Sequence, residues 1–367
     1  MSLRGVEGKK MAFDKALNLL YEACGSAFSG ASVVVGKDGK VLLEEVLGWT
    51  GYDRYGAVVA PVTKETLFDL ASLTKPLCIA TLCMISCEQG KMRLDDKVKM
   101  FLEEAQGTKV GDVTIGALLN HTSGLSAWKP FGSELLTRWG EAVAGTVFAK
   151  QYVLGEILRE PIMGGSQVYS DLGYILLGFV LERVWQMPLR ELFQKEVARR
   201  FGIEEIFFVD RSDSACAIPK SRFAATEVCP VRGRVLQGEV HDENAFVLGG
   251  FAGHAGLFGT ARSVYLLLCA LVKNLWTTME KFLKKDEDET YCYGFDTPSR
   301  QNSSSGEKRP DGLIGHLGFT GTSFWFEPKS MLGVVLLTNR VHPTRENMLL
   351  KEIRPKFHDA VWEEVLK

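Results

Sequence analysis

Strand patterns occur at both ends of this 367-residue chain, and helical patterns occupy most of the middle. Residues 30–48 contain two apolar runs joined by Lys-Asp-Gly-Lys, whose Asp-Gly pair is typical of a tight β-hairpin turn. Residues 312–340 indicate three further strands, and a helix from about 344 to 366 follows them. Because these strands need partners to bury their apolar side chains, we expect both ends of the chain to contribute to one sheet.

This order of elements predicts an α/β domain that is built from both termini, with a largely helical domain inserted into it. We expect residues 10–75 and 310–367 to form the α/β domain, and residues 76–309 to form the mostly helical domain. Within the chain, residues 284–312 are the most polar and loop-like part, so we expect a solvated excursion there.

The charge pattern excludes some classes of partner. The formal net charge is −2, and neither a block of Lys and Arg nor a basic stripe with interleaved aromatic residues is present. We therefore expect no nucleic acid partner and no anionic membrane partner. No apolar run approaches the roughly 18–20 residues that a membrane span requires.

The compartment is predicted from two features of the sequence. The N-terminal residues show no apolar stretch followed by a small-residue cleavage site, so no signal peptide is predicted. The eight cysteines are scattered without a Cys-x-x-Cys pair, which favours buried thiols in a reducing compartment over a disulfide framework or a zinc site. We expect a cytoplasmic protein without metal or cofactor; a periplasmic or secreted protein is the alternative if a signal peptide has been removed.

Ser72 and Lys75 stand three residues apart where a helical pattern begins. A serine hydroxyl is a weak nucleophile that needs a nearby base, and this spacing places the two side chains on one face of a helix. The same residues would also suit an N-terminal cap followed by a lysine that extends to solvent. Ser-x-x-Lys alone therefore does not decide between a catalytic pair and a structural one.

Two further pairs occur downstream of Ser72. Tyr169 precedes Asp171 in a turn that enters a helix, where Asp171 could cap the helix and a phenol near Lys75 could have its pKa lowered and act as a general base. His316 precedes Gly318 on an expected strand, where a glycine would let a substrate backbone approach. Taken singly, each pair is also compatible with ordinary packing, and for His316 alone a structural role is the stronger expectation.

Together and in this order, the three pairs resemble the serine β-lactamase and penicillin-binding-protein superfamily. The resemblance is to the branch that holds class C β-lactamases, D-alanyl-D-alanine carboxypeptidases and related esterases, and it covers roughly residues 12–365. Further similar segments are LLNHTSGL at 118–125, YSDLGYILLG at 169–178, GHAGLFGTA at 253–261, GFTGTSFWFEP at 318–328 and LLTNRVHP at 336–343.

The resemblance implies a β-lactamase/transpeptidase-like fold, in which helices flank an antiparallel sheet and the active site lies in the cleft between the two domains. It implies that Ser72 is the acylated nucleophile, that Lys75 assists its deprotonation, and that Tyr169 shuttles the proton to the leaving group. The backbone N–H groups of Ser72 and Phe319 would form the oxyanion hole. His316 would stand where many members carry a lysine.

The sequence departs from the commonest family pattern at the expected strand. His316 and Leu317 replace a lysine and a hydroxyl-bearing residue, which weakens carboxylate recognition unless Thr320, Thr322 or Arg340 compensates.

Asp171 replaces an amide in the Tyr-x-Asn form of the motif. Its negative charge would favour the ammonium form of Lys75, which in turn would support a Tyr169 phenolate. We count Asp171, His316 and Gly318 as substrate-binding candidates beside the two oxyanion donors.

Other residues have an ordinary structural explanation beside a functional one. We expect His121 and His254 to be loop residues, and we expect His241 and Asp242 to form a turn with local hydrogen bonds, although both could edge the site. Three aromatic residues could line an acyl pocket or simply pack in the core: Trp128, Phe131 and Trp139.

The predicted function is hydrolysis through a Ser72 acyl-enzyme, with a β-lactam or a D-Ala-D-Ala peptide-type amide as the leading substrate. A carboxylesterase of the same fold is one alternative, and a sensor that is acylated with little turnover is another. The expected partner is a small or peptide-like acyl substrate.

Overall fold

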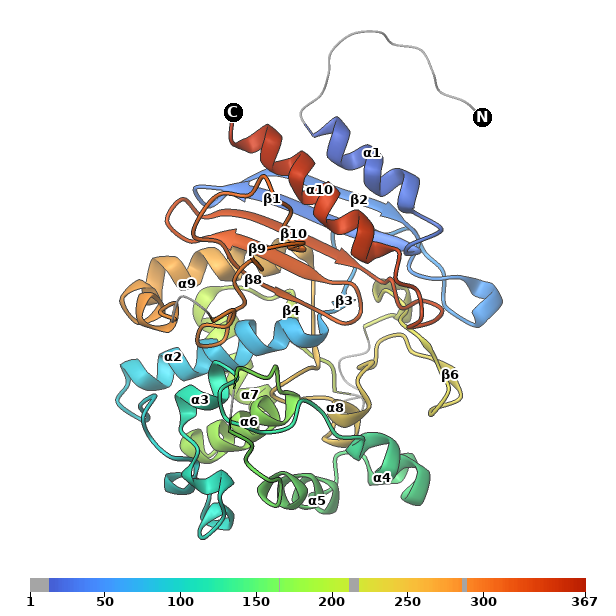
Figure 1. Ribbon diagram of the computed structural model, residues 1–367. Helices are drawn as coiled ribbons and strands as arrows, with labels where there is room; N and C mark the ends of the chain where they lie inside the picture. Colours follow the sequence, from blue (N-terminus) through green and yellow to red (C-terminus); the bar gives the residue numbers. More distant parts are fainter. Residues whose placement is uncertain (1–12, 165, 211–217, 286–288) are drawn as a thin grey trace, which may run out of the picture.

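A five-stranded antiparallel sheet forms the upper half of the molecule in Figure 1. The computed structural model describes residues 13–164, 166–210, 218–285 and 289–367. The strand order is β2-β1-β10-β9-β8, so the two N-terminal strands join the three C-terminal strands at the β1–β10 pair, and every neighbouring pair is antiparallel. The strands are β1 (Gly30–Lys37), β2 (Lys40–Gly48), β8 (Ile314–Leu317), β9 (Ser323–Glu327) and β10 (Leu332–Thr338). This confirms the predicted sheet and its closure by both termini.

The turn between β1 and β2 follows the Asp-Gly signal. Asp38 and Gly39 have φ values of 52° and 75°, the left-handed geometry of a two-residue hairpin whose twist matches that of the strands. β1 then pairs with β10 on its other side, where Val34 lies opposite Val335. A central strand made almost entirely of small and β-branched residues is thereby buried on both faces.

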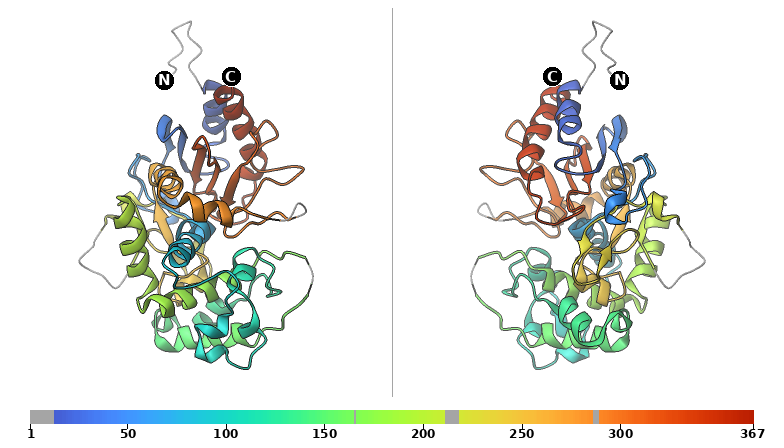
Figure 2. Two further views of the ribbon diagram at one scale, coloured as in Figure 1. Left: turned by 90° about the vertical axis from the view of Figure 1, so that its left-hand side faces the viewer. Right: turned by 90° about the vertical axis from the view of Figure 1, so that its right-hand side faces the viewer.

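Helices cover both faces of the sheet (Figures 1 and 2). On one face, α1 (Asp14–Ala23) packs beside α10 (Leu350–Val365), and Trp362 is fully buried among apolar side chains that include Val33 and Val35. On the other face, α9 (Ala261–Phe282) packs against β1 and β10. Successive side chains of β1 point to opposite faces of the sheet, so Val34 belongs to one hydrophobic core and Val33 and Val35 belong to the other.

The remaining elements form the lower, mostly helical part and the short sheets beside it. The helices are α2 (Thr81–Glu88), α3 (Ile115–Leu119), α4 (Phe131–Trp139), α5 (Val147–Leu158), α6 (Asp171–Trp185), α7 (Leu189–Phe193) and α8 (Glu243–Val247). The short strands are β3 (Phe68–Asp69), β4 (Ile206–Phe208), β5 (Val228–Cys229), β6 (Arg234–Val235) and β7 (Leu257–Gly259). None of the helices in the described part of the chain is long and apolar enough to cross a membrane.

Two expectations differ from the structure. The single helix expected from Ser72 to residue 89 is divided into three segments of different geometry. A 3₁₀ turn at Ala71–Leu73 is followed by a π-helical segment at Lys75–Ala80, and only the last segment, α2, is a regular α-helix. Residues 284–312 are less solvated than expected, since Cys292, Phe295 and Ser305 are buried. The division at residues 75, 76, 309 and 310 stays a prediction; α9, which it assigns to the helical domain, packs on the sheet.

Candidate active site

Ser72 lies in the 3₁₀ turn that follows β3, and the backbone is strained there. Ala71 has a φ of 46°, which a residue with a side chain adopts only where its surroundings impose it. The buried Asp69 supplies this constraint, because its Oδ1 accepts the Ala71 N–H at 2.9 Å and its Oδ2 accepts the His241 N–H at 2.7 Å. The turn therefore presents the Ser72 hydroxyl at a fixed position.

Lys75 is completely buried, with its ammonium group surrounded by three acceptors. Nζ lies 2.9 Å from Ser72 Oγ, 2.7 Å from Asp171 Oδ1 and 3.4 Å from the His254 carbonyl oxygen. A lysine that merely extends to solvent would leave its amine exposed, so the structural explanation of the Ser-x-x-Lys pair is wrong for Lys75. Neither does Ser72 cap a helix, because it lies inside the Ala71–Leu73 turn, and Thr74 is the cap residue of the helical segment that follows.

Tyr169 lies directly before α6, and its ring covers the Lys75 amine at 4.6 Å from the ring centroid. The predicted cap is wrong by one residue: Ser170 caps α6 through the Gly173 N–H, which leaves Asp171 free to pair with Lys75. The ring of His121 stacks on Tyr169 at 4.6 Å, and its Nδ1 accepts the Ser170 N–H. The loop histidine thus fixes the position of the phenol.

The expectation of a lowered Tyr169 pKa is wrong. Burial, together with the carboxylates of Asp171 and Asp296, raises the pKa of Tyr169 well above its usual value, although a hydrogen bond with Ser72 opposes the change. Tyr169 is therefore a neutral phenol at neutral pH, and a neutral phenol can both donate and accept a proton.

His316 lies in β8, and Gly318 directly follows this strand. The rings of His316 and Tyr169 are 5.9 Å apart, and burial together with the Lys75 ammonium lowers the pKa of His316 to about 3. His316 is therefore neutral and does not supply the positive charge that a lysine would. Gly318 is held against the nucleophile turn, because Thr320 and Thr322 donate to the carbonyl oxygens of Asp69 and Leu70.

A cavity of about 590 Å³ brings the predicted residues together. Its lining includes every predicted site residue except the fully buried Lys75: Ser72, Tyr169, Asp171, His316, Gly318 and Phe319. Trp128 also lines it, whereas Phe131 is a core residue and Trp139 lies at the surface against Phe148. A larger cavity of about 870 Å³ between α7 and β4 does not include Ser72.

Sequence reasoning missed several lining residues. Tyr291 and Asp296 come from the segment that was expected to be solvated, and Arg354 comes from α10. His241 and Asp242 were expected to form a turn that could edge the site, and both line the cavity. Asp242 also caps α8 and bonds the ring of His254 at 2.8 Å. Only the short apolar pattern around Cys292 and Phe295 could have indicated that this segment turns inward.

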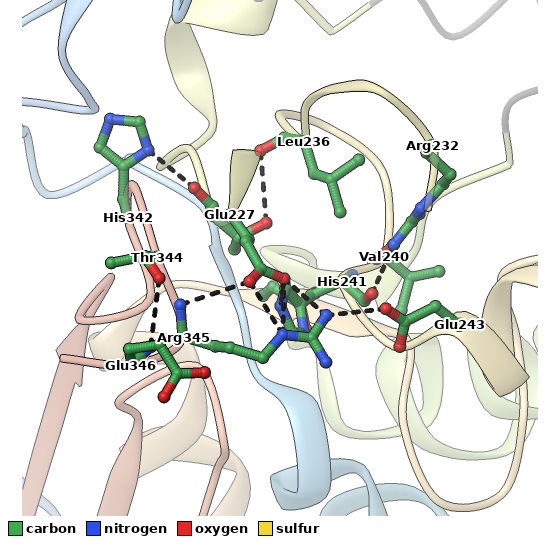
Figure 3. Close-up of polar contacts among 12 residues, drawn as sticks. Glu227, Arg232, Leu236, Val240, His241, Glu243, His342, Thr344, Arg345 and Glu346 are labelled. Atoms are coloured by element: carbon green, nitrogen blue, oxygen red, sulfur yellow. Dashed lines mark hydrogen bonds and ion pairs between the residues drawn. The ribbon is translucent and has the colours of Figure 1, made fainter. Parts of the chain in front are cut away.

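A cluster of polar side chains around Glu227 lies behind Phe319, and Figure 3 shows its internal contacts. Glu227 binds the Arg345 guanidinium and the His241 ring, and Arg345 also binds Glu243. Although burial opposes it, these partners lower the pKa of Glu227 to about 2. The supported His241 ring in turn stacks on Phe319 at 5.6 Å. The expected oxyanion donor is thus held by residues from three separate segments.

The described ranges contain neither a cluster that could hold a metal ion nor a disulfide. No group of three or more His, Cys, Asp or Glu side chains there could hold a metal ion. Seven of the eight cysteines lie in the described ranges, and each is a free thiol; Cys216 lies outside them.

Comparison with known proteins shows the family and the fold of this chain. The Beta-lactamase family matches residues 17–354. The N-acetylmuramyl-L-alanine amidase of Bacillus subtilis (strain 168) is 28% identical over 360 residues, covering 86% of this chain and 78% of the amidase. Among solved structures, a Beta-Lactamase/D-Alanine Carboxypeptidase from Pseudomonas syringae superimposes with a TM-score of 0.71 at 15% identity, covering 95% of this chain and 98% of that one. EstCE1, a hydrolase with promiscuous acyltransferase activity, gives 0.69 at 20% identity, covering 95% and 97%.

Proposed function

We propose, from the premise that this chain is a hydrolase of the Beta-lactamase family, that it cleaves an acyl substrate through a covalent Ser72 ester. The observation that carries the proposal is the short hydrogen-bonded chain from Ser72 Oγ through Lys75 Nζ to Asp171 Oδ1, with steps of 2.9 Å and 2.7 Å. A nucleophile, a buried cation and an orienting carboxylate are thereby held in contact.

The acylation step uses Tyr169 as a proton relay. Ser72 Oγ forms a bond with the substrate carbonyl carbon, and its proton passes to the Tyr169 oxygen as the phenol gives its own proton to the leaving group. The bond from the carbonyl carbon to that leaving group then breaks. Lys75 Nζ, which lies 2.9 Å from Ser72 Oγ, stabilises the negative charge that develops on Oγ. In deacylation the oxygen of a water molecule bonds to the acyl carbon, and the water proton passes to the Tyr169 oxygen as the phenol gives its own proton to Ser72 Oγ. The ester bond between Oγ and the acyl carbon then breaks and releases the acid.

Backbone donors would hold the oxyanion. Ser72 and Phe319 line the same cavity, and their N–H groups are the family's candidates for this role. Removing one such donor typically lowers the rate about 10²–10³-fold. The hydrogen bonds from Thr320 and Thr322 to residues 69 and 70 fix the distance between the two donors.

Two arginines on the cavity wall favour a substrate that carries a carboxylate. Arg340 and Arg354 are each 6% exposed, and burial and the mutual repulsion of the two guanidinium groups lower the pKa of Arg354 to about 10. Within the described ranges, the Arg354 guanidinium has neither a hydrogen-bond nor an ion-pair partner. Arg345, by contrast, is paired with two glutamates. A substrate carboxylate would supply the missing partner.

The covalent step is tested by mass spectrometry of the intact protein. After exposure to a penicillin and, separately, to a fluorophosphonate, we expect an adduct on Ser72 and none in Ser72→Ala. A folded wild-type protein without an adduct from either reagent would contradict the mechanism. A stable penicillin adduct on Ser72 that is not hydrolysed would instead indicate a sensor that is acylated without turnover.

The substrate class is tested with nitrocefin, a D-Ala-D-Ala peptide and a short-chain p-nitrophenyl ester. We expect Arg354→Met to raise KM for the two carboxylate-bearing substrates about tenfold and to leave the ester unchanged. Lys356→Met is the matched control, because Lys356 is an exposed cation on the same helix. Equal loss with all three substrates would contradict carboxylate binding by Arg354 and favour the esterase.

A further inference from the structure

Two side chains on the cavity wall face each other at the edge of the sheet. Asp296 Oδ1 lies 3.7 Å from His316 Nε2, and within the described ranges this buried oxygen accepts no hydrogen bond. Backbone hydrogen bonds fix Asp296 in place, because it exchanges two 2.9 Å bonds with Gly315 on the free edge of β8. The carboxyl group is therefore held beside the imidazole by the sheet itself.

The tautomer of His316 follows from its other nitrogen. Nδ1 lies 2.9 Å from the Leu317 carbonyl oxygen, and a carbonyl oxygen only accepts, so Nδ1 carries the hydrogen. The ring is neutral, because burial and Lys75 lower the pKa of His316 to about 3. Nε2 therefore presents a lone pair toward Asp296.

An ionised Asp296 would place two acceptors against each other in a buried position, which is unfavourable. One proton between them satisfies both groups once a small side-chain rotation shortens the 3.7 Å separation to hydrogen-bond distance. Burial also raises the pKa of Asp296 to about 7, although the Lys75 ammonium opposes this. The lone pair of His316 and the burial of Asp296 therefore both favour the protonated carboxyl group of Asp296.

We infer that Asp296 is a positioning residue of the hydrolytic site, whose protonated carboxyl group donates a hydrogen bond to His316 Nε2 and whose ionisation slows acylation. The kinetic part of this inference rests on the proposed function; the hydrogen bond does not.

The surroundings determine the direction of the pH dependence. The titratable groups whose charge is coupled to Asp296 come from four segments: Lys75, Tyr169, Tyr174, Tyr291, Cys292 and His316. Only Lys75 among them favours the ionised carboxylate. Ionisation adds a negative charge near Tyr169, where acylation already builds negative charge on the oxyanion. The protonated form is therefore the faster one, and the rate falls as the pH rises.

The kinetic test compares Asp296→Asn with the wild-type enzyme, using a p-nitrophenyl ester between pH 5.5 and 9. We expect the wild-type kcat/KM to fall with rising pH through a midpoint near neutrality, up to about tenfold per pH unit. Asp296→Asn keeps a donor and cannot ionise, so this fall should disappear. Asp311→Asn, at an exposed aspartate before β8, is the matched control and should keep the wild-type profile. An unchanged fall in Asp296→Asn would overturn the inference.

A second measurement needs no substrate and separates this inference from the proposed function. In ¹⁵N-histidine-labelled protein, we expect His316 to carry its hydrogen on Nδ1 at pH 6, and its Nε2 resonance to shift with the same midpoint as the rate. The signal is assigned by its loss in His316→Gln. The shift should be absent in Asp296→Asn. A His316 ring with its hydrogen on Nε2 would overturn the inference, whereas failure of Ser72 acylation would overturn only the proposed function.

Discussion

Gly318 is the residue at which backbone geometry constrains the site most tightly. A Cβ atom there would lie 2.0 Å from Thr322 Oγ1 and 2.7 Å from the Leu70 carbonyl oxygen. The second of these atoms is backbone, so it cannot rotate away. We expect Gly318→Ala to displace the end of β8 from the nucleophile turn and to lower kcat/KM about 10²-fold, which is the effect of misplacing reacting groups by about 1 Å.

Steady-state kinetics and thermal unfolding of Gly318→Ala check this expectation. Gly155→Ala is the control, because Gly155 lies within α5 with only the flexible Arg159 side chain nearby. The control should keep full activity and gain up to about 1 kcal/mol from helix propensity. Wild-type kinetics in Gly318→Ala would contradict the close packing at this position.

At the scale of helices and strands, the sequence predicted those turns and helix ends that depend on the residues at that position alone. The β-hairpin follows from Asp38 and Gly39, and the interruption before Pro188 separates α6 from α7. The irregular turns before α2 could not be predicted, because tertiary contacts from Asp69 impose the Ala71 backbone. Likewise, the backbone pairing of Asp296 with Gly315 in β8 could not be predicted, because the residues around Asp296 are polar and resemble a solvated loop.

The polar cluster of Glu227, Arg345, His241 and Glu243 joins elements that local patterns do not connect. Glu227 has a lowered pKa of about 2, so its contribution to stability is complete above the unfolded value near 4.5 and is lost as the pH falls toward 2. We expect Glu227→Gln to lower the free energy of unfolding by about 3 kcal/mol at pH 7. The difference from wild type should shrink below about pH 4.

Urea unfolding at pH 7 and at pH 3 measures both quantities for Glu227→Gln. Glu346→Gln removes an exposed carboxylate beside the same arginine and should change neither. A pH-independent loss in Glu227→Gln would mean that packing, and not the charge of Glu227, stabilises the cluster.

For the whole molecule, the order of motifs along the chain predicted the site better than their individual patterns. Ser72, Tyr169 and His316 are far apart in sequence, and only their common order indicated that they meet in one cavity. The charges of the site could not be predicted in the same way. The pKa values of Tyr169 and His316 move because of burial, which depends on packing that one sequence does not reveal.

Closure of the sheet by both termini makes the two ends of the chain depend on each other. Asn339, directly after β10, accepts the N–H groups of Ser29 and Gly30 at 3.2 Å and 3.0 Å. Its Nδ2 donates to Ser29 Oγ and to the carbonyl oxygen of Ala225, which belongs to the middle of the chain. One buried amide therefore links three distant segments.

We expect Asn339→Ala to lower the free energy of unfolding by about 3 kcal/mol, because it leaves two buried N–H groups without an acceptor. Tryptophan fluorescence and circular dichroism should report one common urea transition at a lower urea concentration, because the N-terminal, middle and C-terminal segments all lose hydrogen bonds to the same side chain. Asn274→Ala is the control, because the exposed Asn274 side chain donates to the Ala270 carbonyl oxygen one turn earlier in α9. Two separate transitions in Asn339→Ala would show that the sheet and the helical part unfold independently, contrary to the coupling inferred from Asn339.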